Sequence, residues 1–131
     1  MEAREHMIES ETASGWLEDE IIHYIFNKSK VELPEAIEAI DIMTAIASGN
    51  TYSYFIDISG VKNITKEARE YFAIPRSTGR NIATAVLAPG LIAKLIGTFL
   101  MTFNNPGVRV KLFTDEQEAI NWLKKEASLH I

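Results

Sequence analysis

The stretch that decides the fold is Tyr52-Ser53-Tyr54-Phe55-Ile56-Asp57-Ile58-Ser59-Gly60. A short run of aromatic and β-branched residues that ends in Ser-Gly is typical of a buried central strand followed by a turn. Asp57 is the only charged residue in the run, and we interpret it as a carboxylate that caps the loop at the strand end. Thr65 follows, and its hydroxyl can cap a helix that continues through Phe72 and is broken by Pro75. The stretch therefore predicts a strand, a turn and a helix in succession.

On the N-terminal side of this unit the sequence predicts a β-hairpin and a helix. Two extended runs between Met7 and Phe26 flank the acidic turn Glu18-Asp19-Glu20. Pro34 then occupies a position that the first turn of a helix tolerates, and Gly49-Asn50 ends that helix.

On the C-terminal side the pattern alternates between strand and helix. We expect a strand over residues 82–88, a turn at Pro89-Gly90, a helix over 91–103, a strand over 108–113 and a helix capped by Thr114 or Asp115. The whole order is ββαβαβαβα. It predicts an α/β fold whose mixed, mostly parallel sheet carries an N-terminal hairpin and four helices. We expect one domain over residues 1–131, with 1–6 as a flexible terminus.

The composition limits the chemistry that this chain can perform. It has 131 residues, a formal net charge of -5 and no cysteine, which excludes thiol catalysis and zinc-thiolate sites and suggests a cytoplasmic protein. The charge is uneven along the chain. Residues 62–111 carry eight bases against two acids, a net +6 between acidic flanks. This distribution favours an anionic partner surface, whereas nucleic acid is disfavoured because the whole chain is acidic.

A long apolar segment, Ile82 to Phe103, contains only one charge, Lys94. It is long enough for a membrane span, but Pro89-Gly90 interrupts it and its second half is amphipathic, so we predict a strand and a helix of a protein that is not transmembrane. The apolar side of that helix packs on the sheet, or also meets a second subunit or lipid. The residues of that side are Ile92, Leu95, Ile96, Phe99, Leu100 and Phe103.

The element order and the phrase Phe55-Ile56-Asp57-Ile58-Ser59-Gly60-Val61-Lys62-Asn63-Ile64-Thr65 resemble the STAS domain of bacterial anti-sigma factor antagonists. The resemblance extends from about Met7 to Lys125. The segment from Val110 to Leu123 is also similar to small uncharacterised proteins described as STAS- or SEC14-like. The resemblance implies a STAS fold and a regulatory, protein-binding role, with a lipid or small-ligand carrier of SEC14-like type as the alternative.

The chain departs from the switching STAS antagonists at one motif. Those proteins carry Asp-Ser-Ser-Gly at the start of the helix after the central strand, and a partner kinase phosphorylates the second Ser. This chain has Thr65-Lys66-Glu67-Ala68 there. We therefore expect no phosphorylation switch. Glu67 either mimics the phosphate or is simply a favourable acid in a first helical turn, and the second reading is the simpler one. Thr65 and Ser59 are hydroxyls whose capping and turn roles explain their presence.

Signatures of catalysis are scarce. The three histidines, His6, His23 and His130, lack the spacing of metal ligands, and we interpret His23 as a residue on a sheet face. No nucleophile motif or glycine-rich phosphate loop occurs. We expect no enzyme, no metal and no cofactor.

The remaining signal is a group of bases and hydroxyls near one end of the sheet, where open α/β folds place their binding crevices. It predicts a partner- or anion-binding surface, although solvated charge that balances the acidic segments also explains it. The residues are Ser59, Lys62, Thr65, Lys66, Glu67, Arg69, Arg76 and Arg80. We expect a non-enzymatic module that binds a protein partner and forms a homodimer through the helix over 91–103.

Overall fold

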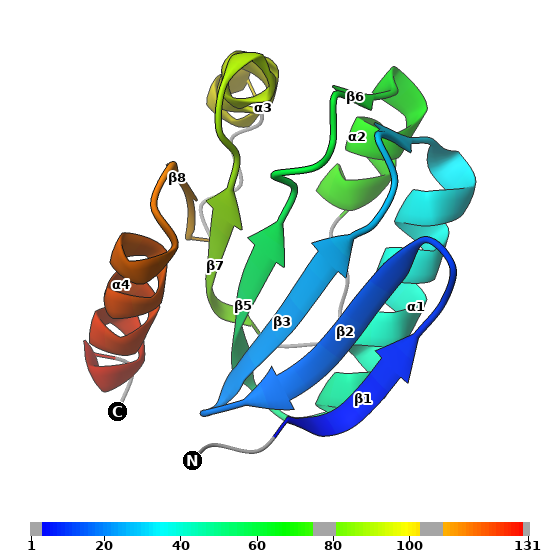
Figure 1. Ribbon diagram of the computed structural model, residues 1–131. Helices are drawn as coiled ribbons and strands as arrows, with labels where there is room; N and C mark the ends of the chain where they lie inside the picture. The colour runs from blue at the N-terminus through cyan, green and yellow to red at the C-terminus, as the bar shows by residue number, and fades with distance from the viewer. Residues whose placement is uncertain (1–3, 75–80, 103–108, 130–131) are drawn as a thin grey trace.

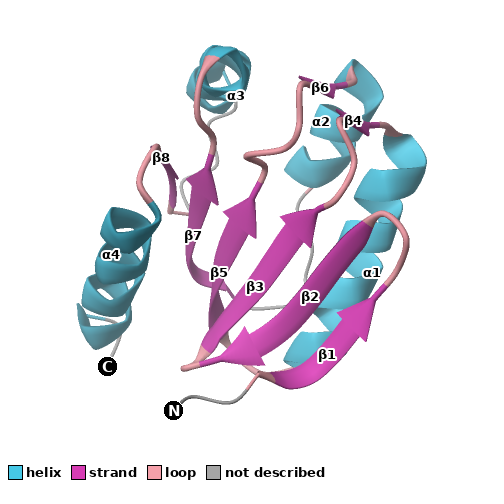
Figure 2. Ribbon diagram, in the orientation of Figure 1, coloured by secondary structure: helices cyan, strands magenta, loops and turns pink. Residues whose placement is uncertain are grey.

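The computed structural model describes residues 4–74, 81–102 and 109–129, and they form a six-stranded sheet with helices on both faces (Figures 1 and 2). The strand order is β1-β2-β3-β5-β7-β8. Its strands are β1 (Glu5–Glu9), β2 (Ala13–Glu18), β3 (Ile21–Phe26), β5 (Tyr52–Asp57), β7 (Asn81–Leu87) and β8 (Val110–Phe113). A separate pair joins β4 (Lys30–Val31) to β6 (Asn63–Ile64). The helices are α1 (Leu33–Ala47), α2 (Lys66–Ala73), α3 (Leu91–Thr102) and α4 (Glu116–Leu129).

The directions of the strands confirm the predicted mixed sheet. β2 runs antiparallel to both of its neighbours, β1 and β3, and β3, β5, β7 and β8 run parallel. The predicted hairpin is present, with Asp19 and Glu20 in left-handed conformations (φ 54° and 62°) at its turn.

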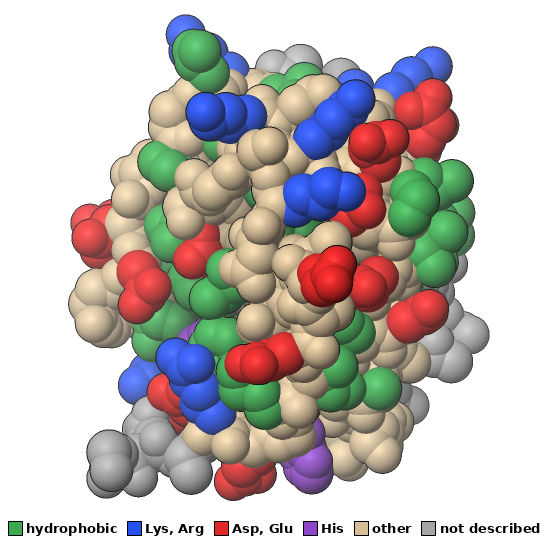
Figure 3. All heavy atoms as spheres, turned by 45° about the vertical axis from the view of Figure 1, so that its right-hand side comes forward, with side chains coloured by type: hydrophobic (Ala, Val, Ile, Leu, Met, Phe, Trp, Pro, Cys, Tyr) green, Lys and Arg blue, Asp and Glu red, His purple; other side chains and the backbone are tan. Residues whose placement is uncertain are grey.

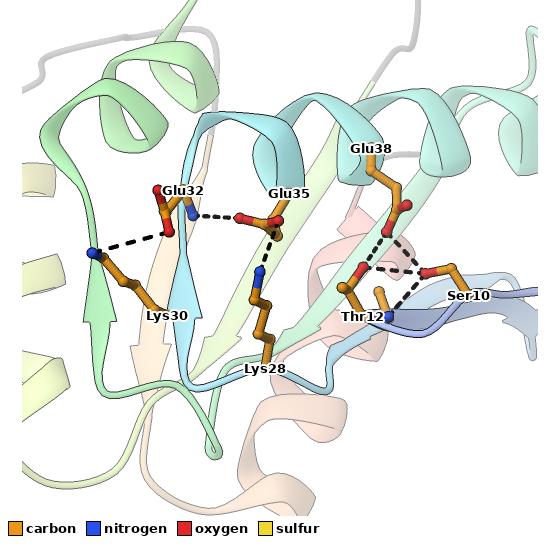
Figure 4. Close-up of polar contacts among 8 residues, drawn as sticks. Ser10, Thr12, Lys28, Lys30, Glu32, Glu35 and Glu38 are labelled. Atoms are coloured by element: carbon orange, nitrogen blue, oxygen red, sulfur yellow. Dashed lines mark hydrogen bonds and ion pairs between the residues drawn. The ribbon is translucent and has the colours of Figure 1, made fainter.

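The first half of that hairpin differs from the prediction, because it contains two strands instead of one extended run. Ser10 Oγ accepts hydrogen bonds from the backbone N–H groups of Thr12 and Ala13, which turns the chain back between β1 and β2. Glu38 of α1 then holds this turn, since its Oε1 accepts hydrogen bonds from Ser10 Oγ (2.9 Å) and Thr12 Oγ1 (2.5 Å) (Figure 4). β1 begins at Glu5 and so includes residues 5 and 6 of the segment expected as a terminus.

Two hydrophobic cores fill the two faces of the sheet. Ile22, Tyr24 and Phe26 of β3 pack with α1, α2 and α3, whereas Phe55 of β5 and Ala85 of β7 pack with α4. The alternation along β3 and β5 assigns successive side chains to opposite faces, as expected for strands covered on both sides. α3 lies at the end of the sheet where β7 finishes (Figure 1). No helix in the described ranges is long and apolar enough to cross a membrane.

Gly15 allows α1 to approach β2 closely. A Cβ atom at this position would lie 3.0 Å from Ile42 Cγ2 and 3.2 Å from both Ile46 Cδ1 and Tyr24 Cδ1. These neighbours are buried, so they have little room to move.

We predict that Gly15→Ala lowers the free energy of unfolding by about 1–3 kcal/mol, the usual cost of overpacking a core. Urea unfolding followed by circular dichroism measures the change. Gly60→Ala is the matched control, because a Cβ there meets nothing within 4 Å, and its effect stays below about 0.5 kcal/mol. Equal effects of the two substitutions would contradict the close approach.

Candidate functional site

The loops that follow β3 and β5 are joined at the carboxyl end of the parallel strands. The parallel pair β4–β6 aligns Lys30 with Asn63 and Val31 with Ile64. The backbone N–H groups of Lys62 and Asn63 both donate to Ser29 O (2.7 and 3.1 Å), and Thr65 N–H donates to Val31 O (3.0 Å). Residues 29–31 and 62–65 are therefore fixed side by side.

The turn after β5 is held by the last residue of that strand. Asp57 Oδ1 accepts hydrogen bonds from the backbone N–H (2.9 Å) and the hydroxyl (2.5 Å) of Ser59. The sequence predicted this capping role of Asp57. The Ser59 hydroxyl proton is donated to a carboxylate, although the residue itself is exposed.

Thr65 and Arg69, which were also predicted as site residues, form hydrogen bonds to the backbone. Thr65 Oγ1 accepts a hydrogen bond from Ala68 N–H (3.2 Å) at the start of α2, which confirms the predicted cap. Arg69 Nη1 donates to Ile64 O (2.5 Å), so the guanidinium is directed toward β6 rather than into solvent. Glu67 is exposed in the first turn of α2, where an acid is favourable for the helix dipole.

Exposed lysines lie at this end in the loops after β3 and β5, in β4 and in α2. We name Lys28, Lys30, Ser59, Lys62 and Lys66 the carboxyl-end surface. In the view of Figure 3 most Lys and Arg side chains lie toward the top, with acidic side chains among and below them. Sequence reasoning missed Lys28 and Lys30. The signal available was their position directly after a strand that runs parallel to β5.

Three of the four lysines have an acidic neighbour. Lys28 Nζ lies 3.2 Å from Glu35 Oε2, Lys30 Nζ 4.0 Å from Glu32 Oε1 and Lys66 Nζ 3.7 Å from Glu70 Oε1 (Figure 4 for the first two). Lys62 forms no ion pair with any residue in the described part of the chain. It is the lysine of this surface whose charge no described acid balances.

The pair Lys28–Glu35 also supports the start of α1. Burial alone would raise the pKa of Glu35, but hydrogen bonds from the Glu32 N–H (2.8 Å) and from Lys28 outweigh it and hold that pKa below its ordinary value. Glu35 therefore remains ionised and satisfies a free N–H at the beginning of the helix (Figure 4).

The remaining predicted residues are placed only in part. Arg76, Arg80 and Phe103 lie outside the described residues, as do the side chains of Phe99 and Leu100. Ile92 and Ile96 are buried in this chain's own core, while Leu95 is half-buried. Packing on the sheet therefore accounts for Ile92 and Ile96, whereas Leu91 is 83% exposed.

His23 lies on the sheet face as predicted, between two aromatic rings. Its ring is stacked on Trp16 (centroids 5.1 Å apart, planes 7° apart) and meets Phe55 edge-on at 5.5 Å. Burial lowers the pKa of His23 below 6.5, against the opposing effect of Glu18. Within the described residues, no three His, Asp or Glu side chains are grouped to hold a metal ion.

We predict that the free energy of unfolding falls as the pH drops below about 6.5, because the unfolded chain then takes up the His23 proton more readily than the folded one. Urea unfolding on either side of that pH measures the change. In His23→Phe, which preserves an aromatic ring, the fall is smaller. An equal fall in both proteins would contradict a half-buried imidazole that stays neutral.

Comparisons with known proteins identify the family and support the fold. A family model for a domain of unknown function (DUF7793) matches residues 15–127. The chain belongs to this family. No curated protein matches it.

A solved structure of similar fold is an uncharacterised protein from the DUF3478 family with a SpoIIAA-like fold, from Shewanella loihica PV-4. It is 16% identical, the match covers 93% of each chain, and the TM-score is 0.58. At that identity the likeness shows the fold alone, and it confirms the predicted STAS-like architecture of this chain.

Proposed function

We propose that this chain is a non-enzymatic, STAS-type protein-interaction module that binds a partner through its carboxyl-end surface without a phosphorylation switch. The observation that carries the proposal is the joining of the two loops by β4 and β6, because it fixes the exposed Lys62 and Lys66 on a preformed surface. A preformed surface binds without the cost of ordering loops.

The hydroxyls at this surface support binding more than chemistry. Ser59 Oγ donates to Asp57, and Thr65 Oγ1 accepts from the backbone of α2. Neither hydroxyl is hydrogen-bonded to a histidine base in the described residues, which an activated nucleophile would need. The ammonium group of Lys62 would instead meet an acidic side chain of the partner.

The alternative, a carrier of lipid or a small apolar ligand, has less support. Its pocket was expected along the apolar side of α3, but Ile92 and Ile96 of that side pack in the core. Among the described side chains of α3, Leu91 is exposed and Leu95 is half-buried, so both are accessible to a homodimer contact. Native mass spectrometry of the purified protein distinguishes these readings, since co-purified lipid would favour the carrier.

We expect Lys62→Glu combined with Lys66→Glu to weaken capture of the native partner at least about tenfold, because like charges would then face its acidic surface. Arg69 is left unchanged, since its guanidinium bonds to Ile64 O. The measurement is quantitative mass spectrometry of proteins that the immobilised chain retains from its native host.

Lys125→Glu is the matched control, because Lys125 is an exposed lysine on α4 with no ion pair among the described residues. The double variant should unfold within about 0.5 kcal/mol of the native chain, as surface substitutions usually do. If the native chain, the double variant and the control retain the same proteins in the same amounts, the carboxyl-end surface is not the binding site.

A further inference from the structure

The two edges of the six-stranded sheet are built differently. At one edge, β1 has an irregular register between Glu5 and Ile8 and a left-handed residue, His6 (φ 53°), and it exposes Glu5 and Glu9. Irregularity and charge are the usual protection of an edge against further pairing. At the other edge, β8 pairs with β7 over four consecutive residues without a shift. The protein thus protects one edge and leaves the other regular.

The backbone of β8 has hydrogen-bonding groups that β7 does not use. Thr84 N–H donates to Arg109 O (2.8 Å), and Ala88 N–H donates to Phe113 O (2.9 Å). Val110 lies opposite Thr84, and Leu112 lies opposite Val86. In a parallel ladder with this register, the N–H and C=O groups of Val110 and Leu112 point away from β7. β7 is the only neighbour of β8 in the described sheet, so these groups lie at an open edge.

A hollow of about 270 Å³ lies at the carboxyl end of β8. Its lining includes four consecutive residues, Lys111 to Thr114. Ala88 directly follows β7 and Thr114 directly follows β8, so the hollow lies at the carboxyl ends of these two strands. Ala88 and Ala93 form its wall on the α3 side, and Glu118 forms the wall on the α4 side.

We propose that the outer edge of β8 receives an extended segment of a partner protein, which adds a seventh strand to the sheet. Its backbone pairs with the N–H and C=O groups of Val110 and Leu112, as in other cases of strand addition. An acidic residue of the added segment lies next to Lys111. This surface is separate from the carboxyl-end surface, so its test is independent of the proposed function.

The charge of Lys111 favours a segment of a different protein at this edge over a second copy of the chain. Two β8 strands related by a two-fold axis, paired through Val110 and Leu112, would place Lys111 opposite its own equivalent. Like charges directly opposite each other destabilise a strand pair. Lys111 is exposed, and its Nζ lies 5.3 Å from the centre of the Phe113 ring. It forms no ion pair with the described residues, so its charge can meet an acid of a different protein.

Val110→Pro tests the added strand directly. Proline lacks the N–H group, but β7 does not use the N–H of Val110, and the first residue of an edge strand tolerates proline. Val110→Ala is the matched control for loss of the side chain. The probe is a phage-displayed library of random linear peptides, selected on the full native chain, and calorimetry then measures the affinity of the tightest peptide.

We expect the selection to enrich peptides that contain both an acidic residue and apolar residues. Val110→Pro should raise their Kd about tenfold, whereas Val110→Ala should change it less than about twofold. Lys111→Glu should also raise the Kd, and it keeps the test valid if the proline variant fails to fold. In hydrogen exchange, the bound peptide should protect the amides of Val110 and Leu112.

Three results would overturn the proposal. They are a selection that enriches no peptide, peptides that bind the native chain and Val110→Pro equally, and exchange protection confined to another part of the protein. A concentration-dependent dimer that Val110→Pro abolishes would assign the edge to a second copy instead.

Discussion

The joining of two loops by β4 and β6 is the constraint on which the rest of the site depends. Each strand has only two residues, but Val31 is fully buried, Ile64 is 4% exposed, and Ser29 O accepts two N–H groups. Because β3 and β5 run parallel, the loops that follow them leave the sheet at the same end. The small β4–β6 pair holds these two loops in a fixed arrangement, which makes their exposed side chains one surface. It also aligns the beginnings of α1 and α2, which follow β4 and β6 directly.

The sequence predicted those parts of the fold that local patterns encode. The run around Phe55 predicted the central strand, and single polar side chains predicted the caps at Asp57 and Thr65, because each acts on a backbone two or three residues away. β4 and β6 were not predicted, since two residues are too few to show a periodicity. The split between β1 and β2 also depends on a distant residue, Glu38, whose contact with Ser10 no local pattern reveals.

The candidate site was predicted less completely, because its charges are arranged by contacts between distant segments. The basic segment over 62–111 does not form one surface in the described residues. Arg69 is directed to Ile64 O, and Arg109 pairs at 2.6 Å with Glu126, a residue that is 8% exposed. Lys28 and Lys30, from outside that segment, complete the surface instead. Their partners Glu35 and Glu32 belong to the start of α1, and such pairings follow from the fold rather than from local sequence.

The central claim is that the carboxyl-end surface is rigid before any partner binds, and native-state hydrogen exchange of the backbone amides tests it most directly. If β4 and β6 hold the loops together, the amides of Lys62, Asn63 and Thr65 exchange far more slowly than that of the exposed Gly60, which follows the same strand. If all four amides exchange at the rate of an open loop, the surface is not preformed and the account is wrong.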